Sequence, residues 1–212
     1  MLGTFRCSIV AGAVIAALLA AAPAPAQDVA AVPSAANCTL PACMGSSPDG
    51  SFVSTIIVRD IANNPVAGSH LTLDFSSCGI FVPCTFPCAG CAAHTSSRTV
   101  TKTADANGVA TFDLRVGGAC GNERVTISAD GVYLGTAAFT PLDQNGDLSV
   151  TGADLVRVQV AESTGDLSCD FDCSGTVTAA DYNIANAHLG ASCSGVVPTT
   201  RSTWGTIKGA YR

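Results

Sequence analysis

The segment RVTISADGVYLGTAAFT, residues 124–140, has the pattern of two β-strands joined by a tight turn. From Val125 to Ala129 apolar residues alternate with polar ones, which is the period of a strand with one buried face. Asp130-Gly131 follows at once and is a two-residue hairpin signal, because such a turn needs residues that tolerate a left-handed backbone. The segment therefore predicts an antiparallel hairpin.

Three more strands are predicted on the N-terminal side of this hairpin. Their sequences alternate or are rich in β-branched residues, and turn signals separate them. They cover residues 55–59, 71–75 and 110–116. Several short strands with regular turns are typical of an antiparallel sandwich, so we expect a mainly β fold with a β-sandwich over residues 50–141.

Two parts of this region resemble the bacterial immunoglobulin-like domains of adhesins and other cell-surface proteins. They are VRD, NPVAG and LTL between residues 58 and 73, and TADANGVATF at residues 103–112. The resemblance implies that the sandwich is immunoglobulin-like. Such domains serve as spacers or as binding modules, and the fold alone does not choose between these roles.

The segment after the sandwich holds the excess negative charge. Residues 143–181 contain eight acids and one base, Arg157, a net −7, and the whole chain carries −6. This acidic balance excludes a nucleic-acid partner. The chain has two glutamates and three histidines, a thin supply of general acids and bases, so we expect no enzyme activity and no catalytic residues. Acidic side chains concentrated among apolar residues need a counter-ion that neutralises their charge. In a secreted protein the abundant one is calcium.

An internal repeat supplies oxygen ligands within this acidic segment. Loop 1, DQNGDLSVTGAD (143–154), and loop 2, DFDCSGTVTAAD (170–181), each run twelve residues from first to last acid. Calcium takes about six to eight oxygens, and alternate residues of a tight loop point inward. The spacing predicts two Ca²⁺ ions, held by loop positions 1, 3, 5, 7 (through its carbonyl), 9 (through water) and 12. These positions are Asp143, Asn145, Asp147, Ser149, Thr151 and Asp154 in loop 1 and Asp170, Asp172, Ser174, Thr176, Thr178 and Asp181 in loop 2.

Short structural elements are expected around the loops. A helix is predicted after each loop, at residues 155–162 and 182–189. Val150 and Val177, both at position 8, are expected to pair as a short strand and to face the core. Without calcium the carboxylates would repel and helices this short would not stand alone, so we expect binding and folding to be coupled. Asx-rich turns that hold no metal are the alternative.

This loop–helix repeat, over about residues 141–192, resembles the type I dockerin domain. The resemblance implies a small helical calcium-binding module that docks onto a cohesin-like protein, often within a polysaccharide-degrading surface assembly. In that family loop positions 10 and 11 help to select the partner, which assigns the contact to Gly152, Ala153, Ala179 and Ala180. Two departures are expected to weaken calcium binding. Leu148 stands at position 6, where the family favours glycine, and Ser174 is a neutral ligand at position 5.

The N-terminal segment has the three parts of a secretory signal peptide. A charged start leads into the apolar run of residues 9–22, and Ala24-Pro25-Ala26 ends it with small residues. After its removal we expect a secreted protein, extracellular or at the cell surface, with no membrane span, because the run is shorter than the ~20 residues that cross a bilayer. An uncleaved anchor is the alternative.

Cysteine usage agrees with secretion. Ten cysteines remain after residue 26, and an even number in an oxidising compartment predicts disulfide bonds. Four lie in one loop, where a zinc site that includes His94 is the alternative. These four are Cys78, Cys84, Cys88 and Cys91.

The distribution of the ten cysteines leaves their pairing open. Seven precede residue 141 and three follow it, so either a disulfide crosses this boundary or each half keeps an unpaired thiol. Cys173 lies inside loop 2. Its neighbours Cys169 and Cys193 suggest a disulfide that ties this loop to the end of the segment.

The sequence therefore predicts a secreted, non-catalytic protein that docks to a partner in a calcium-dependent manner. Two alternatives stay open. Calcium would only rigidify a structural or adhesin protein that has no cohesin-type partner, or the chain would be a small accessory protein that binds glycan. The predicted segments are a signal peptide (1–26), an extended lead-in (27–49), the sandwich (50–141), the dockerin-like domain (142–193) and a flexible tail (194–212).

Overall fold

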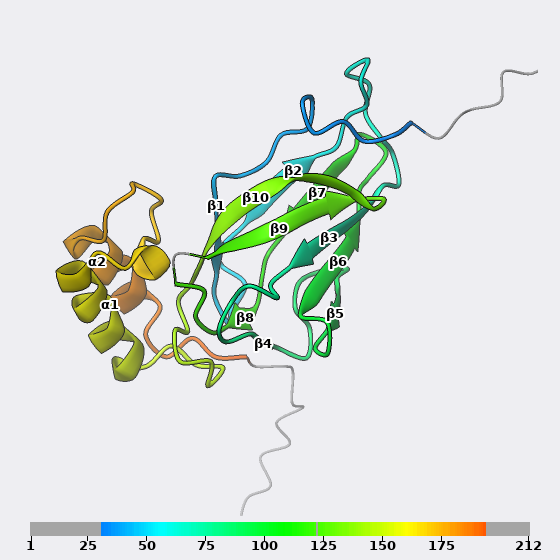
Figure 1. The fold of residues 1–212 in the computed structure, drawn as a ribbon. Coiled ribbons are helices and arrows are strands. Elements are labelled where there is room, and N and C mark those ends of the chain that lie inside the picture. Colours follow the sequence, from blue (N-terminus) through cyan, green and yellow to red (C-terminus); the bar gives the residue numbers. More distant parts are fainter. Residues whose placement is uncertain (1–30, 122, 194–212) are drawn as a thin grey trace, which may run out of the picture.

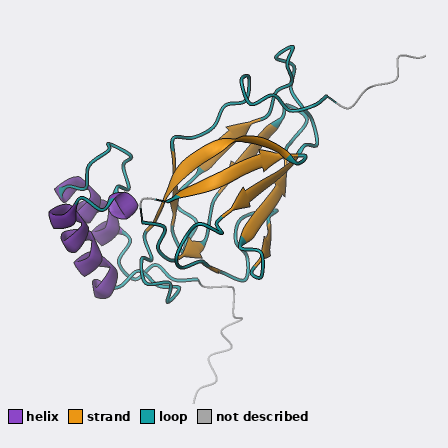
Figure 2. Ribbon diagram, in the orientation of Figure 1, coloured by secondary structure: helices purple, strands orange, loops and turns teal. Residues whose placement is uncertain are grey.

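The structure is a computed structural model that describes residues 31–121 and 123–193. The predicted signal peptide and C-terminal tail lie outside the described residues. The described chain has a strand-rich body and a small group of helices (Figure 2). The helices gather at one end of the body, on the side of strands β1 (Cys43–Ser46) and β10 (Val132–Pro141) (Figure 1).

The strands of the body form one six-stranded sheet and two two-stranded ribbons among the described residues. The sheet has the order β1-β10-β9-β3-β6-β5, and the ribbons are β2–β7 and β4–β8. The remaining bounds are β2 (Ser54–Ile57), β3 (His70–Asp74), β4 (Val82–Pro83), β5 (Ala92–His94), β6 (Thr99–Thr103), β7 (Val109–Phe112), β8 (Val116–Gly117) and β9 (Arg124–Ala129). The prediction of a mainly β chain with helices near its C-terminal end is confirmed.

The predicted hairpin is present as β9 and β10. The two strands are antiparallel, and Val132 pairs with Ala129 across the turn. Asp130 and Gly131 both have positive φ angles, 51° and 79°. The turn therefore forms where the sequence places two residues that tolerate this backbone.

The sheet is mixed, whereas the sequence predicted antiparallel pairing. Strand β1 runs parallel to β10, with Cys43 opposite Ala138. It comes from the segment 27–49, which was expected to be only an extended lead-in. Parallel neighbours need a long connection, and here most of the body separates the two strands in sequence. No local pattern signals such a pairing.

One apolar core joins the sheet to the β2–β7 ribbon. Leu71, Leu73 and Ile127 of the sheet are fully buried together with Ile56 and Phe112 of the ribbon. These are the apolar positions of alternating strands, so the sequence period and the observed burial agree. The core fixes where β10 ends and loop 1 begins.

The helical part contains α1 (Gly152–Thr164), η1 (Leu167–Cys169) and α2 (Ala179–Ala187). Both α-helices start about a turn earlier than predicted, because Thr151 and Thr178 cap them and form capping boxes with Asp154 and Asp181. A second apolar core holds these elements together. It contains Leu142, Val150, Leu155, Val158, Ala161, Cys169, Phe171, Val177 and Ala185.

The predicted pairing of Val150 with Val177 is wrong. Val150 instead pairs with the segment after α2: its N–H donates to the Ala191 carbonyl at 2.7 Å and its carbonyl accepts from Gly190 N–H at 2.8 Å. The returning segment therefore takes the place that loop 2 was expected to fill. Both valines are nevertheless buried in the second core, as predicted.

Two disulfides join the helical part to the body. Cys43 on β1 bonds to Cys173 in loop 2, and Cys84 bonds to Cys193. The predicted link of Cys173 to Cys169 or Cys193 is wrong, because loop 2 lies against the β1 edge of the sheet. Disulfides cross the boundary at residue 141, and each half also keeps a thiol, Cys38 and Cys169.

The cysteine-rich loop of the body is closed by disulfides. Cys78 bonds to Cys120 and Cys88 bonds to Cys91, while Cys84 takes part in the link to the helical part. All four cysteines of the predicted loop are therefore oxidised. A zinc site there would lack its thiolate ligands.

Candidate metal centre

The first acid of each loop accepts hydrogen bonds from several backbone N–H groups. In loop 1 the Asp143 carboxylate accepts from Gly146 N at 2.8 Å and from Leu148 N at 2.8 Å. In loop 2 the Asp170 carboxylate accepts from Ser174 N at 3.0 Å and from Gly175 N at 2.8 Å. Each loop is therefore wrapped around its own first carboxylate.

The two loops share one backbone conformation. Position 4 is left-handed in both, with φ of 73° at Gly146 and 59° at Cys173. Position 6 is also left-handed, with φ of 67° at Leu148 and 89° at Gly175. Leucine at position 6 thus adopts the backbone that glycine adopts in loop 2, at a cost of about 1–2 kcal/mol. Loop 1 therefore forms the same turn as loop 2 despite this departure.

The last acid of each loop closes it. Asp154 accepts from Gln144 N at 2.8 Å and from Thr151 N at 2.8 Å. Asp181 accepts the corresponding bonds, from Phe171 N at 2.7 Å and Thr178 N at 2.9 Å. Each carboxylate therefore ties the start of its loop to the start of the following helix.

The threonines at position 9 have a role that sequence reasoning did not assign. Thr151 accepts from Ala153 N and donates to Asp154 through its hydroxyl, and Thr178 does the same with Ala180 and Asp181. They are N-caps, which hold the closing carboxylates in place.

Four carboxylates of the loops are removed from solvent. Asp143, Asp154 and Asp181 are 0% exposed and Asp170 is 7% exposed. Among the described residues the salt bridge joins Arg115 to Asp113, so none of the four has a basic partner. Burial raises the pKa of Asp143 above its ordinary value, against the amide hydrogen bonds that lower it. Buried charge of this kind is costly unless a cation neutralises it.

Loop 2 brings three of its acids close together. Asp170, Asp172 and Asp181 each offer a carboxylate oxygen, and these oxygens all lie within 4.8 Å of one another. This acidic triad could hold a metal ion. Ser174 and Thr176, also predicted as ligands, lie beside it, with the Ser174 hydroxyl donating to the Thr176 carbonyl at 3.0 Å.

Loop 1 does not gather its acids as closely. The Asp147 carboxylate accepts from Asn145 Nδ2 at 2.9 Å and from Ser149 N at 3.0 Å. No group of three acids as compact as that of loop 2 includes Asp147 within residues 31–121 and 123–193. The Asp147 carboxylate is thus engaged with two other predicted ligands of loop 1.

Loop 1 is built against the body of the protein, which the sequence did not reveal. Gly118 N donates to the Asp143 carbonyl at 2.7 Å. A Cβ atom on Gly117 would lie 2.6 Å from Asp143 Cγ, closer than real Cβ atoms approach. The glycine pair after Val116 is the signal that could have indicated this close approach.

The predicted partner-contacting residues all lie at helix starts. Gly152 and Ala153 begin α1, and Ala179 and Ala180 begin α2. All four are exposed. They leave these helix ends open to contact by another molecule.

Cys169 is expected to resist alkylation in the native protein. The thiol is 1% exposed, and burial raises its pKa to about 11. Because the thiolate is the reactive form, treatment of the native protein with iodoacetamide at pH 8 should label Cys38 before Cys169. Peptide mass spectrometry checks this, with the denatured protein as a control in which both thiols react. Equal labelling of both in the native protein would contradict the observed burial.

No helix among the described residues is long and apolar enough to cross a bilayer. The sequence matches no family model, and no curated protein matches it. Among solved structures, the adhesin InvE of Yersinia pseudotuberculosis is matched at 20% identity with a TM-score of 0.26. The match covers 51% of this chain and 28% of that one, so the chain spans under a third of the adhesin's length. A score this low carries no argument about the fold or function of this chain.

Proposed function

We propose that the protein is a secreted, non-catalytic calcium-binding protein whose loops 1 and 2 each take one Ca²⁺. The observation that carries this proposal is the burial of four carboxylates without a basic partner among the described residues, two in each loop. A carboxylate has about four lone-pair sites, so it can accept the observed amide bonds and still bind a cation. Hard divalent cations prefer such oxygen ligands, and calcium is the abundant one outside cells.

The loops would then differ in their readiness for calcium. Loop 2 already gathers three carboxylates, whereas in loop 1 the Asp147 carboxylate is not part of so compact a group among the described residues and also accepts from Asn145 Nδ2. We expect loop 2 to bind first and more tightly. The neutral ligand Ser174 would instead weaken calcium binding by loop 2. The calorimetric titration described below shows which of these two effects on calcium affinity is larger.

The calcium-loaded helical part is proposed to be a dockerin-like docking module. Support comes from the repeated loop, the matching capped helices and the exposed small residues at both helix starts. Its partner would be a cohesin-like protein, in a cell-surface or polysaccharide-degrading assembly. The body is proposed to be an immunoglobulin-like sandwich that acts as a spacer.

A second candidate function is purely structural, and the disulfides favour it. Cys43–Cys173 and Cys84–Cys193 bind the helical part covalently to the body. A module that is fixed in this way suits a rigid strut in which calcium only stiffens one end. A calcium-dependent pull-down that recovers one specific protein would favour docking, and a stiffened protein that recovers none would favour the strut.

The calcium proposal is tested by calorimetric titration of the oxidised, chelator-stripped protein. We expect two sites with dissociation constants between about 10⁻⁷ and 10⁻⁴ M. Calcium at 100 times the dissociation constant should stabilise the fold by ~2.7 kcal/mol per site. A single site would show that one of the departures, Leu148 or Ser174, prevents binding.

The matched variant carries Asp143→Ala and Asp170→Ala. It should lose the heat of binding and the calcium-dependent rise in melting temperature, because each loop loses its first ligand. Asp105→Ala is the control, since this aspartate caps a turn of the body far in sequence from either loop. An unchanged calcium response in the double variant, or no heat with the native chain, would refute the proposal.

A further inference from the structure

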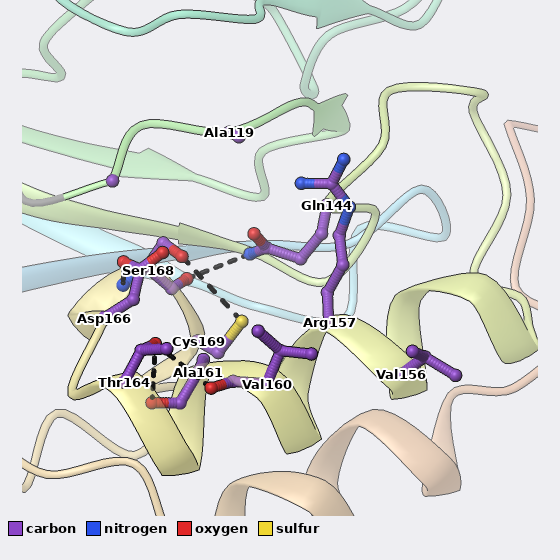
Figure 3. Close-up of a pocket in the computed structure, with 11 residues that line it drawn as sticks. Ala119, Gln144, Val156, Arg157, Val160, Ala161, Thr164, Asp166, Ser168 and Cys169 are labelled. Carbon is purple, nitrogen blue, oxygen red and sulfur yellow. Dashed lines mark hydrogen bonds between the residues drawn. The ribbon is translucent and has the colours of Figure 1, made fainter.

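A cavity of about 290 Å³ lies between the helical part and the body. Its walls come from α1, from η1 and from the connection between β8 and β9 at Ala119 and Gly121. Figure 3 shows Gln144 and Arg157 facing the space between α1 and the segment that carries Ala119. Cavities at such junctions between parts of a fold are preferred sites for small ligands.

Gln144 lines this cavity with an amide group whose orientation is fixed. The side chain belongs to a residue that is 1% exposed, and its Nε2 donates to the Pro141 carbonyl at 2.6 Å and the Ser168 carbonyl at 2.9 Å. Two carbonyl partners fix the amide orientation, because only the nitrogen can donate to them. The oxygen therefore points away from both and accepts no hydrogen bond from the described residues. Gln144 lies in the lining of the cavity.

Two opposite charges line the same cavity without pairing. Arg157 comes from α1 and Asp166 from the start of η1, and neither forms an ion pair within the described residues. One Asp166 oxygen caps η1 by accepting from Ser168 N at 2.9 Å. Both charges belong to the wall that α1 and η1 form. Their sum is neutral.

The remaining wall is apolar. Val156 and Val160 lie one turn apart on α1 and are 57% and 54% exposed. Exposed valines at this spacing give the cavity an aliphatic rim next to its polar groups. A ligand that has C–H groups on one face and hydroxyl groups on another would contact both the apolar and the polar walls.

We propose that this cavity binds a neutral polyhydroxylated unit, a sugar ring. Hydroxyl groups can donate to the fixed oxygen of Gln144 and to Asp166, and can accept from Arg157. Arg157 and Asp166 together give the cavity lining no net charge, which favours neither an anionic nor a cationic ligand. A purely apolar ligand would leave the Gln144 oxygen without a donor. The free sugar and the end of a glycan chain share this chemistry.

The test is a titration of the oxidised full-length protein in calcium, followed by NMR shifts and calorimetry. The probes are glucose, galactose and mannose, the corresponding neutral disaccharides, and glucuronic acid and glucosamine as charged counterparts. We expect at least one neutral sugar to bind with a dissociation constant of about 1 mM or below, and more tightly than its charged counterparts. Equal affinity for the disaccharide places one ring in the cavity, and tighter disaccharide binding indicates a chain end.

Two variants locate the binding. Arg157→Met keeps the aliphatic stem but removes the donors, and Asp166→Asn keeps a capping oxygen but replaces an acceptor with a donor. Each should weaken sugar binding by about tenfold. Glu162→Gln, on the same helix but outside the cavity lining, should change nothing. Binding that is unaffected by both cavity variants, preference for a charged sugar, or no binding by any neutral probe would overturn the proposal.

The outcome is separable from that of the calcium proposal. Gln144 stands at position 2 of loop 1, so the same variants are also titrated with calcium. If Arg157→Met still binds calcium but binds the sugar more weakly, the cavity is a site separate from the calcium loops. If a variant loses sugar affinity only to the extent that it loses calcium affinity, the loss of sugar binding is due to loop 1. That result would overturn the assignment of the sugar site to the cavity.

Discussion

Replacing Asp181 with alanine is expected to destabilise the helical part by about 3 kcal/mol, even in the presence of a calcium chelator. The substitution removes the acceptor for the N–H groups of Phe171, Asp172 and Thr178. It also removes half of the capping box at the start of α2. Buried N–H groups without an acceptor are the main cause of the loss. Urea unfolding followed by circular dichroism measures it, and the melting temperature should fall by about 6–12 °C.

Asp172→Ala is the matched control for this prediction. Asp172 is exposed and belongs to the same triad, so its loss should weaken calcium binding but change stability in chelator by less than about 1 kcal/mol. The pair of variants separates the structural role of a loop carboxylate from its role as a ligand. Equal stability of Asp181→Ala and the unmodified protein in chelator would show that calcium must be bound before the observed hydrogen bonds form.

Replacing Gly117 with alanine is expected to destabilise the protein by about 2–3 kcal/mol and to weaken calcium binding at loop 1. The new Cβ would lie 2.6 Å from Asp143 Cγ, so the carboxylate or β8 must move. Asp143 cannot move freely, because its carboxylate accepts bonds from Gly146, Asp147 and Leu148. Thermal unfolding and calorimetric titration measure the two effects together.

Gly152→Ala is the control for this second variant. Gly152 begins α1 with a negative φ, and nothing lies within 4 Å of a Cβ built there. Its replacement should leave stability within about 1 kcal/mol of the unmodified protein. A Gly117→Ala protein that melts and binds like the Gly152→Ala protein would mean that Asp143 does not depend on its contact with β8.

The elements that could be predicted from sequence are those that depend on neighbours in the chain. The β9–β10 hairpin follows from its alternation and from Asp130-Gly131, whose backbone the turn requires. The helices follow from loops whose ninth and twelfth residues form capping boxes. In each case residues a few positions apart supply both the signal and the contact.

The elements that could not be predicted depend on distant partners. Strand β1 has no clear alternation, and it is placed by β10, which lies far along the chain. Cys43 and Cys173 are 130 residues apart, so their pairing follows from the approach of loop 2 to the sheet edge rather than from spacing. The pairing of Val150 with the segment at Ala191 has the same cause, because that segment returns only after α2 is in place.

The candidate site also combines features that depend on neighbours in the chain with features that depend on distant partners. The first and last acids of each loop are buried and accept hydrogen bonds from residues at most ten positions away in the chain. The contact of Asp143 with β8 and the hydrogen bond of Gln144 to the Ser168 carbonyl arise from tertiary packing. Sequence spacing identifies which side chains belong to a loop, but not which neighbours compete for them.

The disulfide Cys43–Cys173 also determines how the protein would respond to mechanical tension. Tension applied between the chain before Cys43 and the chain after Cys193 would pass through this bond. Residues 44–172 would then be shielded from extension, and they include the whole sheet, loop 1 and α1. The segment between Cys173 and Cys193 could lengthen by at most about 70 Å, at the ~3.5 Å per residue of an extended chain. The second bond, Cys84–Cys193, closes a longer route through residues 44–83, so the shorter route through Cys173 sets the limit of the extension.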